Sequence, residues 1–280
     1  MWRVFLSCRD KESELHGPLT DICGLFLKNS LICKGEDMPL KSLFFNRQLV
    51  LSFILFITLL SAIDLGNATN PYQVVKAEYQ KQQIRISYPR ITNLQDTGKQ
   101  KGINEIIKKE ALKGLNYYLG DTKGLTLNIQ YHITWMGPNL LSIQYQGLGY
   151  TKGAAHPNQL FYTTNLDIQK ARKIRLKDVI RIDRNLVKRL KDKKFKPLTP
   201  ELADMFEDIP SDDLIKSLDN ADSLDNIGTE DQSDIFSYFT KKSLGISFGA
   251  GYAAGGHGEF EIPYKDIRNN VIKNELWKDF

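Results

Sequence analysis

The sequence predicts an α+β fold: antiparallel sheets with helices packed on one face, arranged as two adjoining small modules. Two observations carry this prediction. Apolar and polar residues alternate over several short segments, as is typical of antiparallel strands with one buried face. Other segments carry apolar residues at helical spacing. Because strands and helices occur in separate runs rather than in strict alternation, the pattern favours α+β over a parallel α/β sheet.

The first predicted elements are a strand and a helix. Alternation over 74–89 indicates a strand that Pro89 ends, because proline has no amide hydrogen for a sheet. Asp96 or Thr97 is suited to cap the helix that follows, and Gly120 with Asp121 ends it.

Three strands with short connections follow. The clearest is 125–135, where every second residue from Leu125 to Trp135 is apolar. Further alternation predicts strands within 141–146 and 160–168. Successive strands with short links form an antiparallel meander.

The rest of the chain predicts helices and then two strands. Asp183, Thr199 and Ser211 each precede a helical apolar pattern. The segment 219–230 is rich in Asp and Asn and is expected to be a loop. The last strands are expected over 244–248 and 260–262, separated by a loop rich in glycine and alanine.

An apolar run over 49–63 predicts export. A helix needs roughly 20 residues to cross a bilayer, and this run is shorter. It matches the apolar core of a signal peptide over 38–68, with cleavage after Ala68. The alternative is an uncleaved anchor that meets the membrane only through 49–65. Residues 1–37 are then either an over-extended start or a cytoplasmic tail, and the rest is extracytoplasmic, periplasmic or secreted.

The region after Ala68 is expected to form two modules, 69–150 and 151–280. All three cysteines, Cys8, Cys23 and Cys33, precede it. Disulfides, thiol nucleophiles and thiolate zinc sites are therefore excluded from 69–280.

Charge is unevenly distributed in a chain whose formal net charge is +5. The segment 169–196 has thirteen Lys and Arg against three Asp, whereas 201–234 has twelve Asp and Glu against one Lys. Two segments of opposite charge are expected to face each other or to be solvated helix faces. No nucleic-acid partner is expected. A basic face that meets an anionic envelope polymer or lipid is the alternative.

Catalytic and metal-binding patterns are weak. His132, His156 and His257 are the histidines after residue 68, and they lack a metalloprotease spacing. No nucleophile elbow is expected, because the Gly-x-Ser-x-Gly spacing at 245–249 falls within a predicted strand rather than at a strand-to-helix turn. We therefore predict no metal, no cofactor and no catalytic residue. The alternative is a wall-glycan hydrolase or deacetylase accessory in which His156 and His257 help to bind a metal.

Two loops favour recognition instead. Both are rich in glycine or alanine and carry aromatic and imidazole side chains, which protein-binding surfaces use. The candidate ligand-binding residues are Tyr150, His156, Asn158, Tyr252 and His257.

The same loops carry a resemblance to a known family. The segment 150–158, with Gly153-Ala154-Ala155-His156, is similar to the Gly-Gly-Ala-His motif of RsiV-like extracytoplasmic domains. These consist of two modules, the domains of unknown function 4163 and 3298. The segment 252–264 resembles the end of the second module, and 84–107 resembles the start of the first.

The resemblance implies a bacterial extracytoplasmic α+β domain, and we expect this domain to be non-catalytic. Relatives in this family include an anti-sigma factor that binds lysozyme and the non-catalytic part of a peptidoglycan deacetylase. The expected function is therefore an exported cell-envelope domain that binds a lysozyme-like protein or a wall polymer such as peptidoglycan. The alternative is a membrane-anchored sensor whose cytoplasmic tail engages a regulator.

Overall fold

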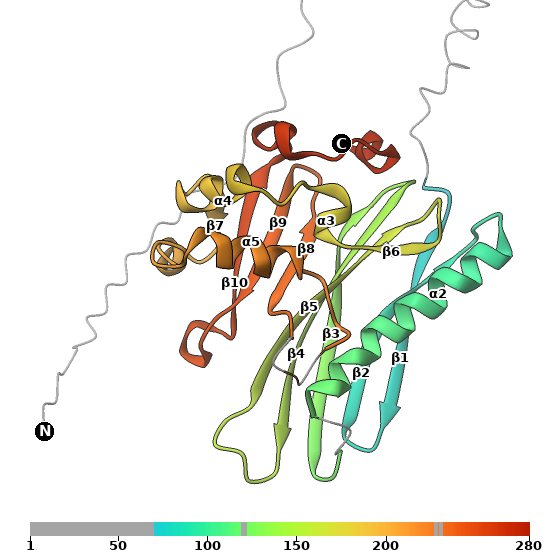
Figure 1. The fold of residues 1–280 in the computed structure, drawn as a ribbon. Coiled ribbons are helices and arrows are strands. Elements are labelled where there is room, and N and C mark those ends of the chain that lie inside the picture. Colours follow the sequence, from blue (N-terminus) through green and yellow to red (C-terminus); the bar gives the residue numbers. More distant parts are fainter. Residues whose placement is uncertain (1–69, 119–121, 227–228, 230–231) are drawn as a thin grey trace, which may run out of the picture. The chain divides into compact units, whose positions relative to one another are not determined.

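A six-stranded sheet forms the first layer of the fold (Figure 1). The computed structural model describes residues 70–118, 122–226, 229 and 232–280. In this sheet the strand order follows the chain, and all neighbouring strands are antiparallel except β2 and β3, which pair in parallel over three residues. The strands are β1 (Gln73–Lys81), β2 (Ile84–Thr92), β3 (Leu125–Met136), β4 (Leu140–Thr151), β5 (Asn158–Asp167) and β6 (Arg172–Ile174).

The prediction of a single strand over 74–89 is wrong, because a tight turn divides this segment into β1 and β2. Gln82 adopts a φ of 54°, which lets the chain reverse direction between Lys81 and Ile84. β2 also continues through Pro89 to Thr92. Only Ile84–Ile86 of β2 pair with β3. Pro89 lies beyond this pairing, where the edge of β2 that faces β3 needs no amide donor.

Helix α2 (Thr97–Leu112) covers one face of the six-stranded sheet. Asp96 caps it as predicted, accepting a 2.8 Å hydrogen bond from the Lys99 amide. The buried residues Ile103 and Ile107 face the sheet. A 3₁₀ helix, η2 (Lys113–Tyr118), continues the chain toward the next strand.

The second layer is a four-stranded sheet whose strand order is β7-β10-β9-β8, with every pair antiparallel. Its strands are β7 (Lys196–Pro197), β8 (Ile235–Phe239), β9 (Ser243–Gly249) and β10 (His257–Pro263). β9 and β10 confirm the two predicted strands. β8 was not predicted, because all five of its residues are buried and leave no alternation in the sequence.

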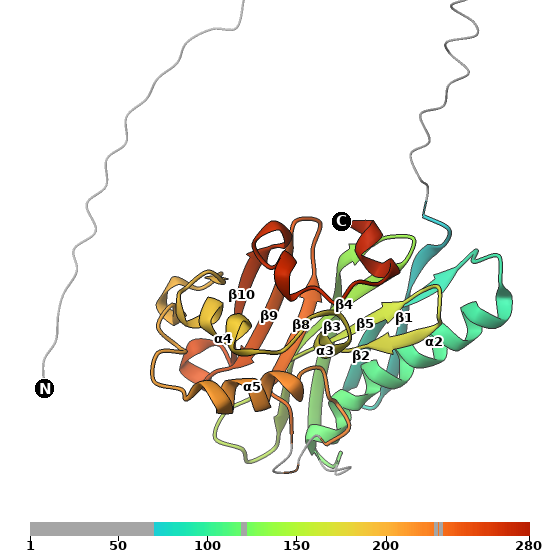
Figure 2. The ribbon, with the colours of Figure 1, turned by 45° about the horizontal axis from the view of Figure 1, so that its top comes forward.

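Three helices cover one face of the four-stranded sheet (Figure 2). They are α3 (Leu176–Val179), α4 (Arg184–Lys191) and α5 (Ser211–Asp219). Asp183 caps α4 as predicted, and α5 begins at Ser211. The helix expected after Thr199 is only a short 3₁₀ turn, η3 (Pro200–Leu202). The remaining 3₁₀ turns are η4 (Tyr252–Ala254), η5 (Tyr264–Asp266), η6 (Arg268–Asn270) and η7 (Glu275–Asp279).

The basic and acidic segments meet in the layer of helices, as one of the sequence interpretations expected. Lys193 pairs with both Asp204 and Glu207, and other pairs join the two segments. These are Lys177 with Asp219 and Arg184 with Asp212. Each pair is largely exposed, so solvent screens its attraction. Their main consequence is that each segment neutralises part of the other.

The α+β prediction is confirmed by two mostly antiparallel sheets with helices on one face of each. The predicted signal peptide over 38–68 and the cysteines lie outside the described residues. Within the described part of the chain, no helix has the length and apolar character to span a bilayer. The division at 150 stays a prediction; β4 and β5, which lie on either side of it, pair directly.

Candidate functional site

Two loops that are about 100 residues apart in sequence meet at one end of the sheets. One connects β4 to β5, and the other connects β9 to β10. The rings of His156 and Tyr252 stack across them, with centroids 4.3 Å apart and planes inclined by 24°. Tyr252 remains 49 % exposed. The structure therefore brings together two residues that the sequence predicted to bind a ligand.

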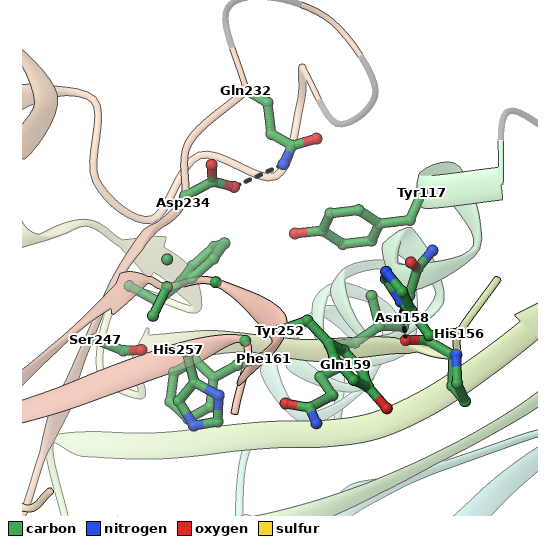
Figure 3. A pocket seen from close by; sticks show the side chains of 17 residues that line it. Tyr117, His156, Asn158, Gln159, Phe161, Gln232, Asp234, Ser247, Tyr252 and His257 are labelled. Carbon is green, nitrogen blue, oxygen red and sulfur yellow. Dashed lines mark hydrogen bonds between the residues drawn. The ribbon is translucent and has the colours of Figure 1, made fainter. Parts of the chain in front are cut away.

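This stacked pair lines a cavity of about 540 Å³, which we call the loop hollow (Figure 3). Its volume is within the range of small-ligand sites, roughly 300–1,000 Å³. It is lined by aromatic rings, imidazoles, amides, one carboxylate and the hydroxyls of one serine and two tyrosines. The main side chains are Tyr117, His156, Asn158, Gln159, Phe161, Gln232, Asp234, Phe236, Ser247, Tyr252 and His257.

Four of the five predicted residues line the loop hollow: His156, Asn158, Tyr252 and His257. Tyr150 does not. It lines an adjacent cavity on the open face of the six-stranded sheet, which we call the face hollow. His257 lines both cavities, so the predicted residues lie in one continuous region of the surface.

A close approach between the two loops depends on Gly256. Its φ of 78° is in the left-handed region, and an added Cβ would lie 2.8 Å from the Cβ of Gln159. A side chain at this position would therefore clash with β5 as well as strain the backbone. Glycine here lets the β9–β10 loop lie against β5 and close the wall that the two hollows share.

His257 forms part of the floor of the loop hollow. Its ring stacks on Phe161, with centroids 4.3 Å apart and planes inclined by 25°. The Nε2 atom lies 3.6 Å from Oε1 of Glu259, which makes an ion pair when the imidazole is protonated. The Nδ1 atom is buried and makes no hydrogen bond to another described residue.

Glu259 connects the two sheets beneath this floor. It accepts a 2.8 Å hydrogen bond from Nε2 of Gln144 on β4. Burial acts to raise the pKa of Glu259, but its interactions with His257, Tyr238 and Gln144 outweigh burial and lower the pKa below the ordinary glutamate value of 4.5. The charged form is therefore stabilised by the fold.

The lowered pKa of Glu259 predicts an acid-dependent loss of stability. A carboxylate whose pKa is lower in the folded state than in the unfolded state stabilises the folded protein at pH values above the unfolded pKa. This contribution to stability is lost as the pH falls through the folded pKa. We expect Glu259→Gln to flatten the dependence of the urea midpoint on pH below the ordinary value of 4.5. The exposed Glu201→Gln serves as the control. If the urea midpoint depended on pH equally in wild type and in Glu259→Gln, this role of Glu259 would be contradicted.

Several lining residues escaped the sequence analysis. Tyr117 comes from η2, Asp234 from the residue before β8, and Ser247 from β9. Burial, with a smaller contribution from the nearby charge of Asp234, raises the pKa of Tyr117, so this phenol remains a neutral hydrogen-bonding group. Asp234 accepts a 2.6 Å hydrogen bond from Gln232. Only the three-dimensional fold brings these residues together. Ser247 is the serine of the Gly-x-Ser-x-Gly spacing at 245–249, but it lies within β9 and not at the strand-to-helix turn of a nucleophile elbow.

Ser247 adds a further polar group to the floor. It is 1 % exposed, and its hydroxyl makes no hydrogen bond to another described residue. Ser247 of β9 lies opposite Glu259 of β10. Glu259 is two residues after His257 on the same strand, so the side chains of all three residues are on one face of the sheet. Buried polar atoms of Ser247 and His257 therefore lie within the floor, beside its aromatic rings.

The chemistry of the loop hollow fits binding of a polar ligand without a strong negative charge. None of its lining residues is lysine or arginine, the residues that hold phosphate and carboxylate groups. Aromatic faces and amide groups are suited instead to rings that carry hydroxyl or acetamido groups. Within the described residues, no three His, Cys, Asp or Glu side chains gather as metal ligands would.

Comparisons with known proteins show similarity to two solved structures. One is a member of the DUF3298 family from Bacteroides fragilis NCTC 9343, with 15 % identity, a TM-score of 0.48, and coverage of 75 % of this chain and 98 % of that one. The other is a DUF3298 family protein from Pseudomonas aeruginosa PAO1, with 16 % identity, a TM-score of 0.44, and coverage of 73 % and 95 %. No family model and no curated protein matches the chain.

Both neighbours are described as members of the family that supplies one of the two modules in the sequence resemblance. The links to domain 4163, to RsiV-like anti-sigma factors and to the peptidoglycan deacetylase stay predictions.

Proposed function

We propose that residues 69–280 form an exported, non-catalytic cell-envelope domain that binds wall glycan at the loop hollow. The observation that carries this proposal is the stacked pair of His156 and Tyr252 over a cavity lined by amides and aromatic rings. Exposed aromatic faces pack on the apolar faces of sugar rings, and amides exchange hydrogen bonds with their polar substituents. Extracytoplasmic location is part of this proposal and rests on the apolar run at 49–63.

A lysozyme-like protein is the competing ligand that the family resemblance suggests. Lysozyme is cationic, and a chain of net charge +5 is not complementary to it overall. The loop hollow contains a single carboxylate, that of Asp234, which offers little attraction for a strongly basic surface. We therefore favour the glycan and treat the protein as a separate arm of the test.

Retention of the purified protein on insoluble peptidoglycan tests the proposal. We expect wild type to be retained and Tyr252→Ala to bind about tenfold more weakly, because truncating an exposed aromatic anchor removes more than about 1 kcal/mol of binding. Tyr252 packs on the surface, so its substitution leaves the fold intact. Val75→Ala is the control, since Val75 is similarly exposed at 46 % but lies on β1.

Immobilised lysozyme forms the second arm of this experiment. Retention on lysozyme but not on peptidoglycan would replace the glycan with a protein ligand. If neither wild type nor Val75→Ala were retained on peptidoglycan or on lysozyme, a wall-binding function would be contradicted altogether.

A further inference from the structure

The face hollow is directly adjacent to the loop hollow. It has a volume of about 590 Å³ and shares four lining residues with the loop hollow. The shared residues are Pro157, Gln159, Leu160 and His257. The two cavities are therefore adjacent, with Gln159 and Leu160 of β5 and His257 of β10 lying between them. A ligand longer than either cavity is able to extend from one into the other.

The face hollow exists because the four-stranded sheet covers only part of β4. Along one face of β4, Ser142 and Gln144 are buried, whereas Gln146 is exposed. β10 begins at His257, and beyond this point no strand covers the lower half of β4 in the part of the chain that the structure describes. The exposed half of the sheet face thus begins where the loop hollow ends.

The side chains that line the face hollow include several amides, and the charged Arg85 lies beside Asn128 on the next strand, outside this lining. Asn128 and Gln130 alternate along β3, and Gln146 lies directly opposite Gln130 on β4. Nε2 of Gln130 donates a 2.9 Å hydrogen bond to Oδ1 of Asn128, which orients both amides. The lining residues of the face hollow include no Asp, Glu, Lys or Arg.

Apolar contact area borders these amides. Leu148 is 55 % exposed and Tyr150 is 39 % exposed, both on the same face of β4 as Gln146. A platform of amides beside an aromatic ring repeats the composition of the loop hollow. Two neighbouring cavities of like chemistry are what consecutive units of one polymer require.

We infer that the two hollows form a single groove with at least two subsites for a linear, uncharged glycan, bound across the strands. This inference rests on the proposed function and adds the length and charge of the ligand. His156 and Tyr252 hold one sugar unit at the loop hollow, and Gln130, Gln146 and Tyr150 hold a following unit at the face hollow. Phosphate-rich polymers are disfavoured, because neither hollow offers a lysine or arginine to pair with them.

Calorimetric titration with N-acetylglucosamine and its uncharged oligomers of two to six units tests the groove. We expect affinity to rise about tenfold from the single sugar to the oligomers that fill both subsites, and then to level off. The double variant Gln130→Ala, Gln146→Ala is expected to lose this gain with length while keeping the affinity for the single sugar. Tyr252→Ala is expected to weaken binding of every length.

Gln80→Ala is the matched control, because it removes an exposed amide from β1, away from both hollows. Affinity that does not depend on length overturns the groove but leaves the proposed function. Retention on peptidoglycan without binding of any oligomer also overturns the groove. Failure to bind both oligomers and peptidoglycan overturns the proposed function as well.

Discussion

Replacing Asp222 by alanine is expected to lower the free energy of unfolding by about 4 kcal/mol, because it leaves buried backbone amides unpaired. Asp222 is 1 % exposed. Its carboxylate accepts hydrogen bonds from the Ser237 amide at 2.6 Å and from the Leu176 amide at 2.7 Å. Each buried N–H without a partner costs about 1–3 kcal/mol.

Asp222 also joins the two sheets. Its carboxylate accepts a further hydrogen bond, of 2.7 Å, from the Ser237 hydroxyl on β8. The Ser237 carbonyl in turn accepts hydrogen bonds from the side chains of Thr163 and Asn165 on β5. Among the described strands β8 is at the edge of its sheet, and its Ser237 amide donates to Asp222 instead of to a neighbouring strand. Burial raises the pKa of this carboxyl, so the loss comes from the donors left unpaired rather than from the charge.

Urea denaturation of wild type and variants measures this effect. Asp222→Asn preserves the size and tolerates the positive φ of 62° at this residue, but it offers one acceptor oxygen instead of two. We therefore expect about half the loss. Asp219→Ala, which removes an exposed ion pair with Lys177, is expected to change stability by less than about 1 kcal/mol. A loss for Asp222→Ala no larger than that of Asp219→Ala would show that Asp222 does not hold the sheets together.

The sequence predicted the parts of the fold whose signals are local. Alternation over 125–135 identified β3 because only one of its faces is buried. Asp96 and Asp183 identified helix starts because capping involves residues three apart in sequence. The turn at Gln82 was missed, since it lacks the Gly, Asn or Pro by which such turns are recognised.

The role of Asp222 was not predictable for a different reason. It lies in an acidic segment that suggested a solvated loop, yet its partners come from α3, β5 and β8. Such an arrangement depends on contacts between residues distant in sequence. The same holds for Tyr117, Asp234 and Ser247 in the loop hollow. His156 and Tyr252 were identified only because their loops are unusually rich in glycine and alanine.

The junction of the sheets and the candidate site depend on each other. Phe161 of β5 and Phe236 of β8 both line the loop hollow, and their ring centroids lie 6.5 Å apart. Asp222, through Ser237, holds β8 against β5 one residue beyond this pair. A change that loosens the junction is therefore expected to widen the floor of the hollow and weaken ligand binding without altering any lining residue.

Replacing Glu110 by alanine is expected to lower the free energy of unfolding by about 3 kcal/mol, the second largest effect. Glu110 lies on α2, is 5 % exposed, and pairs at 2.7 Å with both Lys113 and Lys173. Removing it leaves two largely buried ammonium groups without their shared carboxylate. The loss is at the low end of the range for buried pairs, because Lys113 keeps Asp225 and Lys173 keeps the Asp222 carbonyl.

A double-mutant cycle identifies the source of this loss. Glu110 joins α2 to β6, the last strand of the six-stranded sheet, through Lys173. If the unpaired ammonium causes the loss, Lys173→Met in the Glu110→Ala background restores more than about 1 kcal/mol, because the cation is removed while its apolar stem is retained. Glu105→Ala, an exposed carboxylate on the same helix, is the control and is expected to be nearly neutral. Additive losses for Glu110→Ala and Lys173→Met would mean that the two residues act independently and that the ion pair does not fix α2 to the sheet.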